Sequence, residues 1–234
     1  NTEEMIALLE KTIGRWEGKG VEPPELPPFD RQPEPKVYYV ERPLTQSVIF
    51  LGHPTLTFDN PDYPVIGVLS EIFEGNLYNE IRTRRGLAYA VGSGLSDGYR
   101  IPGILYAYAI TRADATGQVI ELILAEMEKI REVQITTGHA NRVRDGAVNR
   151  AVFRHTSASA IAGRNAVDDL LDIDPGFFEK QLEKIQVLTP GNLLFYAFDY
   201  LRPEEVVIVV VGYAPMFDKK LEEFGEVILV ELEQ

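Results

Sequence analysis

The feature that most constrains the fold is a proline-rich stretch near the amino terminus. Residues 21–36, VEPPELPPFDRQPEPK, contain six prolines in sixteen residues. Proline fixes its own φ and has no backbone N–H, so it is poorly tolerated inside helices and central strands. We therefore predict an extended linker over residues 21–36. This linker separates a short region, residues 1–20, from a domain of residues 37–234.

The region 1–20 carries the pattern of a short amphipathic helix. Thr2 can cap it, EGKG supplies glycines to end it, and its apolar side chains recur at helical spacing, at Met5, Leu9, Ile13 and Trp16. MFDKKLEEFGEV, near the other end of the chain, predicts a similar helix before a glycine. This faint repeat predicts that residues 1–20 are the terminal helix of a preceding similar domain. We accordingly expect the chain, which begins at Asn1, to be processed or excised from a longer protein.

Strand and helix patterns are segregated along residues 37–234. Aromatic and β-branched runs at 37–42 and 46–52 predict two paired strands, and further strands are expected at 87–95, 103–111, 204–212 and 226–233. Residues 114–201 are helical in pattern almost throughout, with Thr189 before Pro190 as one helix start. This order predicts an α+β fold in which a mainly antiparallel sheet is covered by helices.

Another helix is expected between the second and third strands. Asn60 or Asp62 can cap it and Pro64 fits its first turn. Gly75 and Asn76 are expected to interrupt it. A short helix should follow, with Leu77, Tyr78 and Ile81 facing the core and Gly86 at its end. Alternation of side chains in the strand 87–95 predicts that Leu87, Tyr89 and Val91 share one face. In the strand 103–111 the same alternation predicts a shared face made of Ile104, Tyr106, Tyr108 and Ile110.

Charge and composition exclude several classes of function. The formal net charge of −13 disfavours nucleic acid and anionic membranes as partners, because both would be repelled. The chain has no cysteine, which excludes disulfides, thiolate zinc sites and cysteine nucleophiles. No apolar run approaches the length of a membrane span, so we expect no transmembrane segment.

A basic cluster within NEIRTRRGLAYAVGSG, residues 79–94, requires an explanation in so acidic a chain. Arg82, Arg84 and Arg85 stand just ahead of Gly86. Cations complement the negative end of a helix dipole and glycine commonly ends helices, which accounts for the clustering. It leaves open whether Arg82 and Tyr89, seven residues apart, are an ordinary surface arginine and strand tyrosine or a functional pair.

The whole chain resembles the carboxy-terminal half of a pitrilysin-type zinc metallopeptidase, the family of insulin-degrading enzyme and the mitochondrial processing peptidase. The landmarks are the proline linker, YPVIGVLSEIF, LYNEIRTRRGLAYAV and IQVLTPGNLLFYAFDYLRPEEVVIVVVG. The spacing within RTRRGLAY is the most specific of them. The turn FEGNLY departs from the family, being shorter and poorer in glycine than is usual there.

The resemblance implies a function shared between two halves that close around a chamber. One half carries zinc on an inverted His-x-x-Glu-His motif, and the other contributes an arginine and a tyrosine that reach the substrate, here Arg82 and Tyr89. The chain is thus expected to be the non-zinc half of an endopeptidase, inactive alone, supplying substrate-binding and oxyanion-stabilising residues. The alternative is a non-catalytic scaffold or peptide-binding domain of the same fold. Arg84 and Arg85 have no implied role.

Neither a metal site nor a phosphate-binding loop is expected in this chain. Its histidines are His53, His139 and His155, and no two of them are spaced to share one helical face. His53 is interpreted as a strand-end residue, and the other two as exposed helix residues. Gly92 and Gly94 lack the rest of a nucleotide-binding motif and are interpreted as bend or edge positions.

The expected partners follow from the resemblance. They are a zinc-bearing homologous domain or subunit and a peptide substrate, with zinc held by the partner half and no cofactor in this chain. The peptide is expected to add to a sheet edge formed by residues 87–95, since strand addition needs little sequence choice. The export of many bacterial relatives points to the periplasm or envelope.

Overall fold

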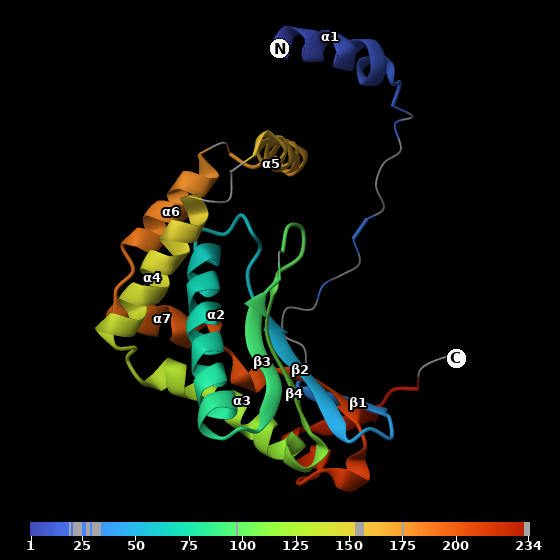
Figure 1. The fold of residues 1–234 in the computed structure, drawn as a ribbon, viewed down its shortest axis with the longest axis vertical. Coiled ribbons are helices and arrows are strands. Elements are labelled where there is room, and N and C mark those ends of the chain that lie inside the picture. Colours follow the sequence, from blue (N-terminus) through green and yellow to red (C-terminus); the bar gives the residue numbers. More distant parts are fainter. Residues whose placement is uncertain are drawn as a thin grey trace.

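The computed structural model describes residues 1–18, 20, 25–26, 29, 34–96, 98–152, 157–174 and 176–231. The predicted amino-terminal helix is present as α1 (Thr2–Thr12), followed by a 3₁₀ turn, Ile13–Arg15. Asn1 caps it in place of Thr2, accepting the N–H of Glu3 at 3.1 Å. No residue of α1 is buried, and the helix lies apart from the domain (Figure 1). Most of the predicted linker lies outside the described residues.

The domain is built on one six-stranded sheet with the order β3-β4-β2-β5-β1-β6. The strands are β1 (Lys36–Glu41), β2 (Gln46–Pro54), β3 (Ala88–Leu95), β4 (Ile104–Arg112), β5 (Val207–Gly212) and β6 (Glu226–Leu229). Neighbours from β3 to β5 are antiparallel, whereas β1 pairs in parallel with β5 and β6. The predicted α+β fold with a mainly antiparallel sheet is confirmed, and 87–95 supplies the edge strand, as expected.

The predicted pairing of the first two strands is wrong. β5 lies between them, so that Val209 is opposite both Tyr38 of β1 and Phe50 of β2. A period-2 pattern tells which face of a strand is buried, but it does not tell which strand lies beside it. β5, although far along the chain, therefore lies beside β2 in the place where β1 was expected.

Helices cover one face of the sheet (Figure 1). The helices after β2 are α2 (Tyr63–Leu77), α3 (Thr116–Glu132), α4 (Thr137–Val152), α5 (Ala158–Leu170), α6 (Phe177–Gln186) and α7 (Pro190–Tyr200), of which α5 lies beyond the end of the sheet (Figure 1). They confirm the helical prediction for 114–201. α2 and α3 contact the strands, and α4 and α6 pack outside α2. The core between sheet and helices includes the fully buried Ile49, Leu69 and Phe73. Among the described residues no helix combines the length and apolar character needed to span a bilayer.

The opposite, open face of the sheet carries a row of mostly apolar residues. The row crosses all six strands in register, and its members are Gly92, Tyr108, Phe50, Val209, Tyr38 and Ile228. Phe50 is 41% and Tyr108 is 37% exposed. The predicted alignment of Ile104, Tyr106, Tyr108 and Ile110 is confirmed, since the intervening β4 residues are buried on the helical side.

Side chains at helix ends tie distant segments together. Thr189 and Asn192 form a capping box at the start of α7, next to Pro190 as predicted. At the start of α2, Pro64 lies in the first turn as predicted, but Asp62 makes no capping hydrogen bond. Its carboxylate instead accepts hydrogen bonds from Lys184 and, at 2.7 Å, from the Tyr200 hydroxyl. Asp62 thereby links α2 to α6 and α7.

The predicted amphipathic helix near the carboxy terminus is absent from the described residues. Residues 214–224 form two short 3₁₀ turns, Ala214–Met216 and Leu221–Phe224. Between them the carboxylate of Asp218 accepts the N–H groups of Gly117 and Gln118, at 2.8 and 2.9 Å, at the start of α3. This long-range cap favours the interrupted conformation, because it satisfies helix-terminal N–H groups that otherwise lack partners.

His53 is a strand-end residue, as predicted, and its side chain is buried. It is the penultimate residue of β2. Its ring makes two hydrogen bonds, one between Nδ1 and the Pro54 carbonyl (2.9 Å) and one between Nε2 and the N–H of Arg202 (3.3 Å). A carbonyl only accepts and an amide N–H only donates, so the neutral imidazole carries its proton on Nδ1. Burial lowers the pKa of His53 below its ordinary value, although the Pro54 carbonyl opposes this.

The lowered pKa of His53 predicts a pH-dependent stability. Because the unfolded chain binds this proton more readily, stability is complete above the unfolded pKa of about 6.5 and falls as pH drops toward the folded pKa. Replacing His53→Gln should therefore reduce the slope of unfolding free energy between pH 7 and 5, measured by denaturant titration. Burial also lowers the pKa of His139, so His139→Gln should remove a separate part of the slope, and the variant with both changes should lose both parts. Equal slopes in the parent and in His53→Gln would contradict this assignment.

Candidate functional site

Arg82 lies on a π-helical segment, Tyr78–Arg84, that continues α2 without a break. Leu77 and Ile81 are fully buried, as predicted, and anchor the segment to the core. π-helical turns are rare and occur frequently at functional sites, because the extra residue redirects side chains. Here the buried anchor at Ile81 leaves the adjacent Arg82 exposed at the helix end.

Two details of the predicted helix are wrong. Gly75 and Asn76 do not interrupt α2, because the Asn76 amide donates a 2.7 Å hydrogen bond to Glu126 of α3 and holds this turn against the core. Tyr78 does not face the core but is 46% exposed. Its ring instead lies beneath the guanidinium of Arg82, 5.3 Å from ring centroid to Cζ.

Gly86 ends the helical segment as predicted. Its φ of +61° is in the left-handed region that favours glycine. Its N–H donates to the Arg82 carbonyl at 3.2 Å, and the N–H of Leu87 donates to the Ile81 carbonyl at 3.0 Å. The chain then turns into β3, which packs against the π-helical segment. Arg82 and the start of β3 are thus brought to one end of the sheet edge.

Glu80 separates the three arginines into two kinds. It accepts hydrogen bonds from Arg84 and Arg85, both at 2.8 Å. The hydrogen bond from Arg85 is the main reason that the pKa of the Glu80 carboxyl lies below its ordinary value, so this carboxylate stays charged. Within the described chain Arg82 has no ion pair, only its contact with Tyr78. Arg82 is therefore the arginine whose donors remain available to a ligand.

Tyr89 is the extra residue of a β-bulge in the edge strand. Ala88 is opposite Thr111 and Ala90 is opposite Ile110, so Tyr89 has no partner position on β4. Its side chain is 76% exposed. Bulges are frequent at sheet edges and next to active sites, where they re-aim a side chain. The bulge turns the Tyr89 phenol away from the core.

This bulge also corrects the predicted face of the strand. Val91 is buried and Leu87 packs against the core, whereas Tyr89 points outward, because one extra residue breaks the period-2 alternation. In the part of the chain that the structure describes, no hydrogen bond engages the Tyr89 hydroxyl. Arg82 and Tyr89 thus present unengaged donors on neighbouring segments.

Sequence reasoning missed the role of Glu80, although a signal was present. Glu80 precedes Arg84 by four residues and Arg85 by five, and an acid four residues ahead of a base is a common helical ion pair. That spacing distinguishes Arg84 from Arg82. The bulge at Tyr89, by contrast, has no evident signal in the sequence.

The described residues do not fit a zinc site. Zinc is held by three or four converging histidine, cysteine or carboxylate ligands. No group of three such side chains converges anywhere in the described ranges. His139 lies on α4 and is partly buried, with its pKa lowered chiefly by burial, which corrects the predicted exposed position. His155 lies outside the described residues.

Gly92 and Gly94 are edge-strand positions, as predicted, and aromatic rings explain them. A Cβ on Gly92 would lie 2.9 Å from the Tyr108 ring, and one on Gly94 would lie 2.5 Å from the Tyr106 ring. Glycine leaves room for these rings in the positions that they occupy on the open face. Both residues are therefore accounted for by packing within the sheet.

The sheet and its helical cover have the fold of one half of a pitrilysin-type peptidase. The family model described as the peptidase M16 inactive domain matches residues 1–146. The chain belongs to this family, and the resemblance seen in the sequence is confirmed.

Similar proteins support the same assignment. An uncharacterized zinc protease of Streptomyces coelicolor is 26% identical over 191 residues, which cover 79% of this chain and 40% of that protein. A peptidase M16 inactive domain from Pseudomonas fluorescens has a TM-score of 0.72 at 21% identity, covering 82% of this chain and 47% of that one. A Helicobacter pylori protease has a TM-score of 0.79 at 16% identity, with 90% and 52% covered. The chain thus spans about half or less of these relatives.

We predict that this chain alone neither holds zinc stoichiometrically nor cleaves peptides. The reason is the lack of a converging ligand set in its described part, together with the lack of a general base beside such a set. Metal analysis of the purified chain should find only traces of zinc, and incubation with an unstructured peptide should leave that peptide intact. One tightly held zinc per chain would contradict the prediction.

Proposed function

We propose that this chain is the non-zinc half of a zinc-dependent endopeptidase and that it supplies Arg82 and Tyr89 to a zinc site on another domain or subunit. The observation that carries the proposal is the contrast within the basic cluster. Arg84 and Arg85 are bound to Glu80, whereas Arg82 and the bulged Tyr89 are exposed, without hydrogen-bond partners among the described residues.

The chemistry of peptide hydrolysis suits these two donors. Attack of water on a peptide carbonyl builds negative charge on the carbonyl oxygen. A guanidinium and a phenol both donate hydrogen bonds, and they stabilise such a charge most where water is excluded. Closure of the partner half over this end of the sheet would provide that exclusion. Arg82 can in addition hold the ground-state peptide, because its charge is permanent.

The peptide substrate is proposed to add to the outer edge of β3. This strand, AYAVGSGL, has neither a charged residue nor a proline to guard its edge, although natural edge strands commonly carry such protection. Backbone hydrogen bonds along this edge would hold an extended peptide with little sequence preference. The apolar row on the open face, which includes Phe50 and Tyr108, lies beside this edge and offers contacts to peptide side chains.

The amino-terminal helix indicates how the two halves are joined. α1 and the segment just after it expose an apolar set that has no cover in the described chain, namely Met5, Ile6, Leu8, Leu9, Ile13 and Trp16. We propose that α1 is the terminal helix of a preceding similar domain, which buries this face. For location we propose the bacterial periplasm or envelope. A solved structure with the same fold, at 15% identity and a TM-score of 0.73 over 91% of this chain and 24% of its own, is the periplasmic protease PqqL of Escherichia coli.

The role of Tyr89 is tested in the protease assembled with its zinc half by fusion or mixing. Tyr89→Phe removes one donor and keeps the ring, so folding should change little. Turnover should fall by roughly 10² to 10³, about 3 to 4 kcal/mol, if the hydroxyl meets the developing oxyanion. Arg82→Ala should lower turnover and also weaken substrate binding. Steady-state kinetics on a fluorogenic peptide measures both parameters.

Arg84→Ala is the matched control for these variants. It removes a neighbouring arginine whose charge is already engaged by Glu80, so turnover should stay within a few-fold of the parent. If Tyr89→Phe and Arg84→Ala behave alike in a folded, active assembly, Tyr89 has no catalytic role. The chain would then be better described as a non-catalytic scaffold or peptide-binding domain.

Amide hydrogen exchange tests strand addition separately. On binding an extended peptide, outward-facing amides of residues 88–95 should exchange more slowly, because they acquire hydrogen-bond partners. The amides of α4 to α7 should change little and serve as the internal control. Protection confined to those helices would argue against peptide binding at this edge.

A further inference from the structure

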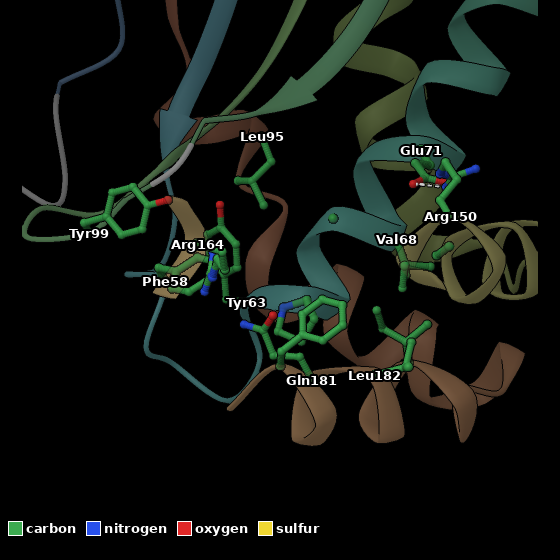
Figure 2. Close-up of a pocket in the computed structure, with 16 residues that line it drawn as sticks. Phe58, Tyr63, Val68, Glu71, Leu95, Tyr99, Arg150, Arg164, Gln181 and Leu182 are labelled. Carbon is green, nitrogen blue, oxygen red and sulfur yellow. Dashed lines mark hydrogen bonds and ion pairs between the residues drawn. The ribbon is translucent and has the colours of Figure 1, made fainter. Parts of the chain in front are cut away.

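A cavity of about 350 Å³ lies between α2, α4 and α6. Leu95, the last residue of β3, lines it together with Tyr99 of the following loop. Figure 2 shows Leu95 on one side and Gln181 and Leu182 of α6 on the other. The cavity therefore lies at the opposite end of the edge strand from Tyr89. Leu95 lies six positions after Tyr89, a span of about 20 Å in an extended strand.

One wall of the cavity is aromatic. The Phe58 ring lies 5.3 Å from each of Tyr63 and Tyr99, measured between centroids. The Arg164 guanidinium covers Phe58 at 5.0 Å from its centroid. Such a wall favours a flat ring, because aromatic rings attract each other in stacked and edge-on arrangements.

The charges lining the cavity are balanced. Arg164 pairs with Asp168 at 2.8 Å. Arg150 of α4 pairs with Glu71 of α2 at the other end of the cavity, as the dashed line in Figure 2 shows. With both arginines neutralised by carboxylates, the lining favours an uncharged occupant over an anion.

One polar group in the lining lacks a partner. Nε2 of Gln181 is buried and makes no hydrogen bond within the described part of the chain. A buried donor without an acceptor is unfavourable, and an occupant that supplied an oxygen would relieve it. The cavity thus combines an aromatic wall, balanced charge and one hydrogen-bond donor, the features of a small specificity pocket.

We propose that this cavity binds an aromatic side chain of the peptide that pairs with β3, with Gln181 donating to an oxygen of that residue. The inference rests on the proposed strand addition and adds a specificity determinant to it. The preferred aromatic residue lies about six positions along the peptide from the residue beside Tyr89. The cavity then selects the peptide through a residue that lies about 20 Å from the bond that is cleaved.

The test measures binding of fluorescent ten-residue peptides to the 234-residue chain by anisotropy. The peptides are identical except for the position of a single tyrosine, and one has none. We expect about tenfold tighter binding when tyrosine occupies the matching position, the gain expected for burial of one aromatic ring at an interface. Equal affinity across the series would overturn the proposal.

Gly67→Leu blocks the cavity. Gly67 lines it from α2, and a Cβ there meets no atom within 4 Å, so leucine enters open space and also favours the helix. The tyrosine advantage should disappear while the peptide without tyrosine binds as before. Gly67→Ala, which leaves room, and Gly191→Leu, an exposed position on α7 outside the cavity, should both retain the advantage. Retention of the advantage in Gly67→Leu would contradict the proposal.

N-acetyl-tyrosinamide separates the cavity from strand addition. Its binding, followed by saturation-transfer NMR, should weaken in Gly67→Leu and, through loss of the donor, in Gln181→Leu. If it binds in this way but no peptide protects β3, the cavity site stands and the proposed peptide edge fails. If peptides protect β3 without any tyrosine preference, the edge stands and the cavity proposal is overturned.

Discussion

The candidate site depends on the packing of α2 against the edge strand β3. Leu69, Ile72 and Phe73 of α2 are fully buried, and each such side chain contributes about 1.5–3 kcal/mol relative to exposure. This packing fixes the π-helical extension of α2, and Gly86, at positive φ, directs the chain back along the sheet. The two candidate side chains, Arg82 and Tyr89, need no contact with the core, because the segments that carry them are already held.

The burial of neighbouring residues explains why the exposed donors are well placed. Ile81 is fully buried beside Arg82, and Ala88 is buried beside Tyr89. Glu80 forms ion pairs with Arg84 and Arg85, so that only Arg82 of the cluster has no ion pair among the described residues. The acidic surface of the chain, with a net charge of −13, makes such an unpaired arginine notable. Its neighbours Arg84 and Arg85 are both neutralised by one carboxylate, that of Glu80.

Much of the fold was predictable because burial periodicity is local. The alternation in β4 and the helical pattern of residues 114–201 identified their elements correctly. Errors arose where distant segments decide the outcome. β5 displaced the expected pairing of β1 with β2, the carboxylate of Asp218 caps α3 where a helix was expected, and Asn76 bonds to Glu126 where an interruption was expected. Propensity cannot anticipate these contacts, since each joins residues far apart in sequence.

The candidate residues could be named from the sequence, but their geometry could not. The spacing of Arg82 and Tyr89 suggested the pair through the family resemblance, whereas the bulge that exposes Tyr89 depends on the register with β4. The cavity at Leu95 left no sequence signal, because its lining comes from four helices, two loops and the end of β3. A strand edge with a donor pair at one end and an aromatic pocket at the other therefore emerges only from the folded chain.

The central claim is that Arg82 and Tyr89 serve one developing charge. The most direct measurement is a double-mutant cycle of Tyr89→Phe and Arg82→Ala, read as kcat/KM in the assembled protease. Donors to a single oxyanion should couple, so the double variant should lose less than the sum of the two single losses, by about 1 kcal/mol or more. Losses that simply add would show that the two side chains act independently and would contradict the account.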